Sequence, residues 1–188
     1  MLVGLDNSSA ISGWATIIGK QITCGSHKVV GPTQIEKFSN YRAFIRDFIQ
    51  KAQESPEKIE AVAIEEAIMT NATLTVIEKN PDSKWFGAKR KMPSTSFDTQ
   101  SALLGIRGIC MVEFFDAGIP VHLVRPDEWR LSVMGVCRAP KGSTDKKWLK
   151  NRWRERVEAM GVIVPNSDAS DAVGVAMWLM AHLRKYPR

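Results

Sequence analysis

A short, uninterrupted apolar run limits the possible folds of this chain more than any other feature. The run Ala61-Val62-Ala63-Ile64 leaves no polar side chain to face water, which is typical of a strand buried on both faces of a sheet. Such a strand needs helices on both sides, and 188 residues, 44% of them hydrophobic, are enough to supply one such domain. Glu65 follows the run directly, so we expect a carboxylate at the mouth of a buried strand.

The rest of the pattern predicts an α/β domain. Alternation and tight turns at the N-terminus indicate three antiparallel strands, and later elements alternate between helix and strand, which favours a mixed five-stranded sheet flanked by helices. One domain should span residues 1–188, with a long basic loop inserted at about 70–98. We expect strands at 2–5, 13–18, 22–30, 61–64 and 119–124, and helices starting near Ser39 or Asn40, Thr99, Pro126, Ser143 and Ser167 or Asp168.

Composition excludes several classes of protein. Lys and Arg number 26 against 20 Asp and Glu, a formal charge of +6 that favours an anionic partner. No stretch is long and apolar enough for a membrane span, and there is no secretion signal, so we expect no membrane partner. Cys24, Cys110 and Cys137 lie far apart in the sequence, as is typical of reduced thiols in a cytoplasmic protein.

Four carboxylates fall at the ends of predicted elements. Asp6 and Glu65 each end a strand, while Asp168 and Asp171 share one face at the start of the last helix. Carboxylates gathered there would repel one another unless divalent cations neutralised them, and oxygen ligands favour Mg²⁺ or Mn²⁺. Three of them also have an ordinary explanation, since Asp6 suits a turn and the helix pair suits the helix dipole, whereas a charge on Glu65 at the end of an apolar strand is costly. Spacing alone leaves both interpretations open.

Three segments resemble the acidic motifs of RuvC-type Holliday junction resolvases in order and spacing. They are Gly4-Leu5-Asp6-Asn7-Ser8-Ser9 with Gly13-Trp14-Ala15, then Ala63-Ile64-Glu65-Glu66, and Asp168-Ala169-Ser170-Asp171-Ala172. The resemblance implies a ribonuclease H-like fold in which Asp6, Glu65, Asp168 and Asp171 are the catalytic ligands of two Mg²⁺ ions, with Mn²⁺ as a substitute. The segment 142–146 resembles the family's Gly-Ser-x-x-Lys, which makes Lys146 a catalytic residue.

The same resemblance implies a function. It predicts a homodimeric endonuclease that resolves four-way or branched DNA in recombination or repair, leaving 5′-phosphate and 3′-hydroxyl ends, in a bacterial or phage-infected cell. The helix at 102–115 is the expected dimer surface. Two alternatives stay open: an RNase H-like or flap nuclease, and a catalytically idle DNA-binding protein of the same fold.

The sequence also departs from the family pattern. Asp-Pro-Gly after the first strand is Asp6-Asn7-Ser8 here, and Ile68 occupies the position of the family's aromatic wedge. Trp85 or Phe86 in the insertion is a possible replacement for that wedge, and a chance aromatic pair in a surface loop explains them equally well. The longer insertion suggests a phage or prophage member.

Basic residues gather beside the predicted site. Between 141 and 156 the chain has seven basic residues against two acidic ones, which favours phosphate contact, although a solvated helix face explains the pattern as well. Of the tryptophans in this segment, Trp148 is the one we expect in the core. The predicted DNA contacts are Arg130, Lys141, Lys147, Lys150 and Arg154, together with Lys89, Arg90 and Lys91 of the insertion.

Overall fold

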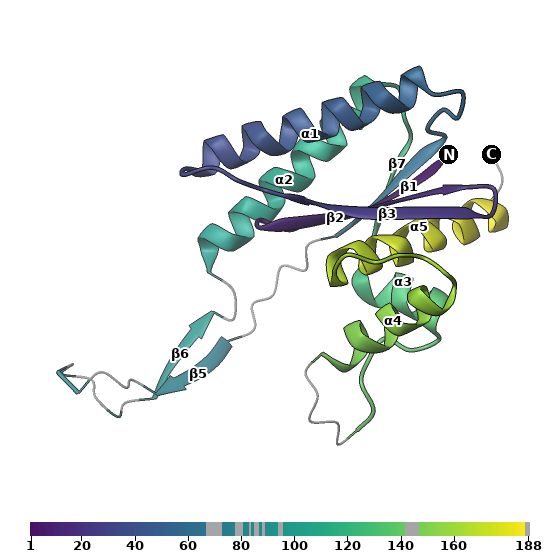
Figure 1. The fold of residues 1–188 in the computed structure, drawn as a ribbon. Coiled ribbons are helices and arrows are strands. Elements are labelled where there is room, and N and C mark those ends of the chain that lie inside the picture. Colours follow the sequence, from purple (N-terminus) through teal and green to yellow (C-terminus); the bar gives the residue numbers. More distant parts are fainter. Residues whose placement is uncertain are drawn as a thin grey trace.

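A mixed five-stranded sheet divides the molecule into two layers of helices (Figure 1). The computed structural model describes residues 1–66, 73–77, 81–82, 84, 87, 89–93, 96–141 and 147–186, with backbone alone for 73–77 and 89–93. The strand order is β3-β2-β1-β4-β7, in which β1, β2 and β3 are antiparallel and β4 and β7 run parallel to β1. The strands are β1 (Leu2–Asp6), β2 (Ile11–Ile18), β3 (Gln21–Lys28), β4 (Ala61–Glu65) and β7 (Val121–Val124).

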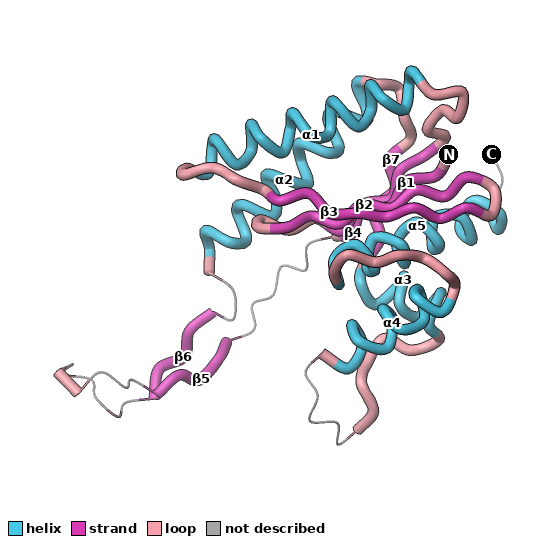
Figure 2. Tube along the Cα trace, in the orientation of Figure 1, coloured by secondary structure: helices cyan, strands magenta, loops and turns pink. Residues whose placement is uncertain are grey.

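Helices cover both faces of this sheet, as the apolar run in β4 predicts. Figure 2 shows α1 and α2 on one face and α3, α4 and α5 on the other. The helices are α1 (Gln34–Glu54), α2 (Phe97–Asp116), α3 (Pro126–Met134), α4 (Trp148–Ala159) and α5 (Ser167–Lys185). None of the described helices is long and apolar enough to cross a membrane.

The two faces of the central strands carry side chains of different size. Leu5 and Ile64 point into the core with α1 and α2, whereas Ala61 and Ala63 point into the core with α5, because successive side chains of a strand alternate between faces. All four residues of the apolar run are buried, which confirms the prediction for this segment. Small side chains on one face therefore let α5 lie close to the sheet.

Two glycines bring the start of α5 directly onto the sheet. A Cβ atom on Gly4 would lie 2.4 Å from the backbone oxygen of Ala172, and one on Gly13 would lie 1.9 Å from the backbone oxygen of Asp168. Both distances are far shorter than van der Waals contact, so only glycine fits at these positions. This contact places the first turns of α5 beside the end of β1.

Element order matches the prediction, but two helix starts differ. The first helix begins one to two turns before Ser39 or Asn40, because Thr33 is the N-cap and forms a capping box with Glu36. The predicted Ser143 cap is wrong, since α4 begins at Trp148 with Lys147 at the N-cap position. Inside the predicted loop, β5 (Thr73–Ile77) and β6 (Lys89–Pro93) pair as an antiparallel ribbon that extends away from the body (Figure 1).

Candidate active site

The four predicted carboxylates converge at one edge of the sheet. Asp6 is the last residue of β1 and Glu65 the last of β4, directly after the paired residues Leu5 and Ile64 of these parallel strands. Asp168 and Asp171 lie one turn apart in the first turns of α5, the helix that packs on β1. The structure therefore brings these four residues to the same end of the central strands, while their role as metal ligands stays a prediction.

A side-chain network fixes the turn that follows Asp6. The Tyr41 hydroxyl on α1 donates a hydrogen bond to Asn7 Oδ1 at 2.6 Å, and Asn7 Nδ2 lies 3.5 Å from Cys110 Sγ on α2. Ser12 Oγ accepts from the Ser8 amide and donates to the Ser8 carbonyl, both at 3.1 Å. The turn after Asp6 lacks the proline of Asp-Pro-Gly and is held by side-chain hydrogen bonds instead.

Glu65 is held by a tryptophan. The indole Nε1 of Trp129, on α3, donates a hydrogen bond of 2.5 Å to Glu65 Oε2, and the Trp129 side chain is fully buried. Next in sequence, the Arg130 guanidinium lies over the Trp129 ring, 5.0 Å from its centroid. Helix α3 therefore reaches the carboxylate at the end of β4.

Two basic groups lie among the carboxylates of α5. Lys150 Nζ, on α4, is 3.2 Å from Asp168 Oδ1 and 3.5 Å from Asp171 Oδ2, and Arg130 Nη2 is 3.7 Å from the same Asp171 oxygen. The other oxygen, Asp171 Oδ1, is buried and has no hydrogen-bond partner among the described residues. The helix start is fixed by Asn166, whose side chain accepts from the Ala169 amide at 2.9 Å.

The environment disfavours negative charge on three of the four carboxyls. Burial raises the pKa of Asp6 well above its usual range, and the nearby charges of Glu65 and Asp171 raise it further. Burial also raises the pKa of Glu65 to about 7, although the hydrogen bond from Trp129 and the charge of Arg130 oppose the shift. Burial raises the pKa of Asp171 despite the opposing charges of Lys150 and Arg130. Lys150 and Arg130 are therefore too few to neutralise the four carboxylates.

These residues form a donor set suited to a hard divalent cation. All four side chains offer oxygen atoms alone, and a cation would neutralise the cluster and give Asp171 Oδ1 a partner. Within the described part of the chain, no three acidic, His or Cys side chains are placed to share one ion, and the Lys150 ammonium lies between Asp168 and Asp171 instead. The donors fit Mg²⁺ or Mn²⁺.

The residues predicted to contact DNA have different places in the structure. Lys150 and Arg130, predicted as DNA contacts, contact the carboxylates, and Arg154 pairs with Glu158 on its own helix at 2.8 Å. Lys141 and Lys147 are exposed, and Lys147 is at the N-cap position of α4. Lys146, Ile68, Trp85 and Phe86 lie outside the described residues, and so do the side chains of Lys89, Arg90 and Lys91.

The prediction for the tryptophans of α4 is wrong, because Trp153 rather than Trp148 is the one buried in the core. Trp153 is buried and donates from Nε1 to the Ser170 carbonyl at 2.6 Å. Trp148, expected in the core, is half-buried at the helix start with the Arg152 guanidinium 5.3 Å from its ring centroid. The helix register explains the difference, because starting at Trp148 turns Trp153 and Val157 inward.

Sequence reasoning missed Trp129 and assigned Lys150 to a different role. Trp129 belongs to none of the acidic motifs and is 64 positions from Glu65 in the sequence. Lys150 is one of several basic residues on its helix. No local pattern marks either contact. Only the relative placement of α3, α4 and β4 shows them.

Known structures share this fold. A Thermus thermophilus RuvC in complex with a Holliday junction substrate matches at a TM-score of 0.63 with 14% identity, and another Thermus thermophilus RuvC structure at 0.64 with 16%. Each match covers 98% of this chain and 95% of the other. A yeast mitochondrial Holliday junction resolvase matches at 0.50 with 9% identity, over 98% of this chain and 80% of the other. No protein-family model and no curated protein matches the sequence.

The class of fold follows from these comparisons. The chain has a ribonuclease H-like fold, with a mixed sheet of three antiparallel and two parallel strands between helices. Within that class it has the architecture of RuvC-type resolvases along nearly its whole length. The predicted fold is therefore confirmed, whereas the phage or prophage origin stays a prediction.

Proposed function

We propose that this protein is a Mg²⁺-dependent endonuclease that cleaves four-way or branched DNA. The convergence of Asp6, Glu65, Asp168 and Asp171 at one sheet edge carries the proposal, because a repulsive acidic cluster would weaken a protein that only binds phosphate. The RuvC structures of the same fold support the choice of substrate, since one of them holds a Holliday junction.

In the proposed reaction the four carboxylates would hold two Mg²⁺ ions. Bound Mg²⁺ supplies Lewis-acid activation of a water molecule and of the leaving oxygen. Asp6 and Glu65 present their oxygens from the ends of strands, which keeps them in place, and α5 presents Asp168 and Asp171. Cleavage on the 3′ oxygen side leaves a 5′-phosphate and a 3′-hydroxyl, ends that a ligase can join.

In this proposal Lys150 and Arg130 also interact with the phosphate. With Asp168 and Asp171 holding a divalent cation, the Lys150 ammonium and the Arg130 guanidinium would be available to the phosphate, whose negative charge grows during the reaction. Lys146 remains the further catalytic lysine that the sequence predicts.

Helix α4 supplies a basic surface next to the acidic edge. Lys147, Arg152 and Arg156 are exposed on or beside this helix, and a hollow of about 440 Å³ is lined by Met134, the two arginines and Glu155. We propose that this surface contacts the DNA backbone. Each phosphate contact should steepen the salt dependence of junction binding by about one unit of log slope.

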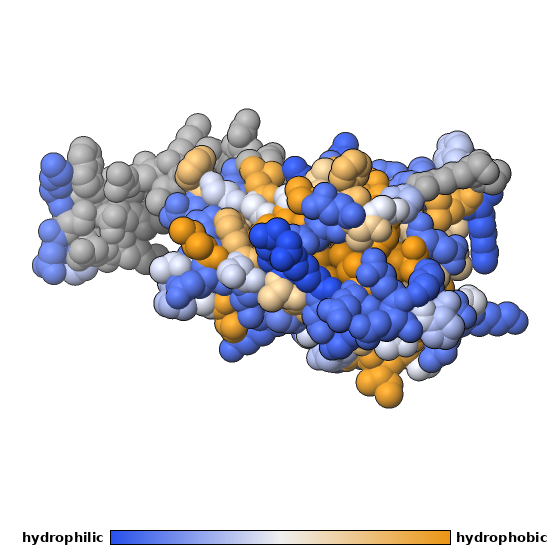
Figure 3. Space-filling model, turned by 90° about the horizontal axis from the view of Figure 1, so that it is seen from above, coloured by the Kyte–Doolittle hydropathy of each residue, from blue (hydrophilic) through white to orange (hydrophobic). Residues whose placement is uncertain are grey.

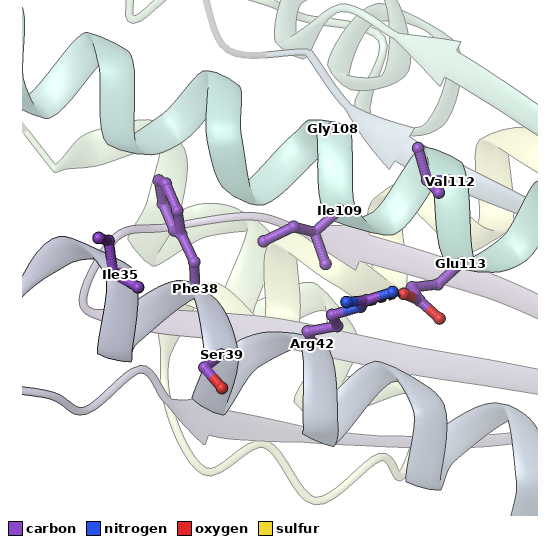
Figure 4. A pocket seen from close by; sticks show the side chains of 8 residues that line it. All are labelled: Ile35, Phe38, Ser39, Arg42, Gly108, Ile109, Val112 and Glu113. Carbon is purple, nitrogen blue, oxygen red and sulfur yellow. Dashed lines mark hydrogen bonds and ion pairs between the residues drawn. The ribbon is translucent and has the colours of Figure 1, made fainter.

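The opposite face of the sheet offers a surface for a second copy. Exposed apolar side chains lie among charged ones over α1 and α2 (Figure 3), and Val112 and Phe115 are 54% and 77% exposed. A hollow of about 450 Å³ between α1 and α2 is lined by Phe38, Ile109 and Val112, with Arg42 and Glu113 directed toward each other at one end (Figure 4). A two-fold dimer through α2 would cover these side chains and present two active sites to opposite strands of a junction.

Labelled synthetic substrates test the proposed function. Four-way junction, flap, Y-form, duplex and RNA–DNA hybrid substrates are incubated with the protein in Mg²⁺, in Mn²⁺ and in a chelator. We expect cleavage of the four-way junction first, in either metal and not in the chelator.

The alternatives predict different patterns on the same substrates. Preferential cutting of the hybrid identifies an RNase H-like enzyme, and preferential cutting of the flap identifies a flap nuclease. Junction binding with no cleavage of any substrate in either metal identifies the idle DNA-binding protein. Each of these results overturns the proposal.

A further inference from the structure

Trp129 joins α3 to the end of β4 in the candidate site. Its indole Nε1 donates to Glu65 Oε2 at 2.5 Å, a short distance for an N–H donor, and its ring is fully buried. The contact occupies one oxygen of Glu65, so the carboxylate has a fixed orientation and one oxygen left for other partners.

The surrounding fold makes room for this ring. A Cβ atom on Gly174 of α5 would lie 2.4 Å from the Trp129 ring, so the helix passes close to the indole at a residue without a side chain. The ring also packs edge-on against Trp153 at a centroid distance of 5.8 Å, and Trp153 Nε1 donates to the Ser170 carbonyl. One tryptophan thus holds Glu65 and the next holds the turn of α5 between Asp168 and Asp171.

We propose that Trp129 is a positioning residue that fixes Glu65 for Mg²⁺, and that Gly174 is required because it gives the indole its place. This inference rests on the proposed function of the site. An indole N–H is a donor without acceptor capacity, so it orients the carboxylate and never competes with it for the ion. Partners of this kind, which hold a ligand from behind, typically change metal affinity by about 10–100-fold when removed.

A purely structural role predicts something different. In that case Trp129 would fill the core, Glu65 would only satisfy its N–H, and any loss of metal affinity would follow the loss of stability. Trp178 is the matched control, because it lies in the same core at 6% exposure and stacks on His182 near the other end of α5.

The first experiment measures Mg²⁺ binding by isothermal titration to the full chain and to its variants. We expect Trp129→Phe to weaken Mg²⁺ binding about tenfold and to raise the Mg²⁺ concentration for half-maximal junction cleavage by a similar factor. Trp178→Phe should lower Tm without changing either value.

A second pair of variants avoids cutting a large side chain out of the core. Gly174→Ala should displace the indole and weaken Mg²⁺ binding, even though alanine is a better helix former than glycine. Gly108→Ala on α2 is the control, because a Cβ atom there meets nothing within 4 Å, and its Mg²⁺ binding should equal that of the wild type.

Indole NMR tests the hydrogen bond itself, with no need for activity. In protein labelled with ¹⁵N-tryptophan, the six indole N–H signals include one that Trp129→Phe removes. We expect that signal downfield of the others, and we expect it to move in Glu65→Gln and on addition of Mg²⁺, while the Trp178 signal stays in place.

The outcomes separate this inference from the proposed function. A wild type that binds Mg²⁺ and cleaves junctions, with unchanged Mg²⁺ binding in Trp129→Phe and Gly174→Ala, overturns the inference alone. A Trp129 signal that is the same in Glu65→Gln as in the wild type also overturns it. A wild type that binds no Mg²⁺ overturns both.

Discussion

The two faces of the sheet treat buried carboxylates in opposite ways. On the α1–α2 side, Glu113 is 8% exposed and accepts hydrogen bonds from both Arg42 and Arg46, which lower its pKa. On the α5 side, four carboxylates share Lys150 and Arg130, and the pKa values of Asp6, Glu65 and Asp171 are raised. The first arrangement stabilises the fold. The second leaves negative charge without enough positive partners, and a bound metal ion would neutralise it.

The largest expected difference comes from neutralising one acid on each face. Asp6→Asn should reduce junction cleavage at least about a thousandfold, because metal ions supply several kcal/mol of transition-state stabilisation. It should retain junction binding and be at least as stable as the metal-free wild type at pH 7, since burial disfavours the charge that it removes. Cleavage rates, binding by gel shift and Tm measure the three effects.

Glu113→Gln is the matched change on the other face. It should destabilise the protein by roughly 1–2 kcal/mol, because two charge-assisted hydrogen bonds are weakened, and leave the cleavage rate of the folded fraction close to that of the wild type. Cleavage by Asp6→Asn at the wild-type rate, or loss of cleavage in folded Glu113→Gln, would remove the contrast between the faces.

The next largest effect concerns the assembly. Phe115→Glu places a charge on the exposed apolar surface of α2 and should convert a dimer into a monomer, as measured by light scattering after size exclusion. Paired nicking of one junction should be lost with it. Ile163→Glu is the control, because Ile163 is 91% exposed and lies between α4 and α5 rather than on α2. If both variants keep the wild-type mass, α2 is not the dimer surface.

The acid site should also affect stability through pH. Glu65 has a pKa raised from 4.5 to about 7, so the folded protein binds more protons than the unfolded chain in that window. The metal-free protein should therefore lose stability as pH rises from 4.5 to 7, by several degrees in Tm. Glu113 has the opposite sign, because its lowered pKa gives stability that is lost only as pH falls.

Glu65→Gln separates the two contributions. Melting curves of this variant should show a smaller fall in Tm across the same pH window, and saturating Mg²⁺ should have a similar effect on the wild type. A metal-free wild type with constant Tm from pH 4.5 to 7 would contradict the proposed burial of charge.

The smallest effect comes from the lysine within the acid site. Lys150→Met should lower the Tm of the metal-free protein by about 2–4 °C, since a half-exposed pair is worth about 1 kcal/mol at most. The stabilisation by Mg²⁺ should then be larger than in the wild type, because the ion neutralises the carboxylates that Lys150 no longer contacts. Lys51→Met removes an exposed pair with Asp47 and should change neither value.

Local pattern was sufficient to predict the sheet and to place the carboxylates at the ends of elements, whereas their assignment as metal ligands rests on the resemblance to the family. The apolar run before Glu65 defines a buried strand, and the spacing of Asp168 and Asp171 defines one helix face. Trp129 and Lys150 could not be predicted as partners of these acids, because their contacts depend on how α3 and α4 pack. The start of α4 was misplaced, since Ser143, which lies outside the described residues, has the chemistry of a cap, while the helix begins at Trp148.

Mapping the nicks that the protein makes in a synthetic four-way junction tests the central claim most directly. With Mg²⁺ present, the account predicts nicks in two opposing strands, with 5′-phosphate and 3′-hydroxyl ends that DNA ligase seals to linear duplexes. No nicks in either Mg²⁺ or Mn²⁺, or nicks whose ends ligase cannot join, would contradict it.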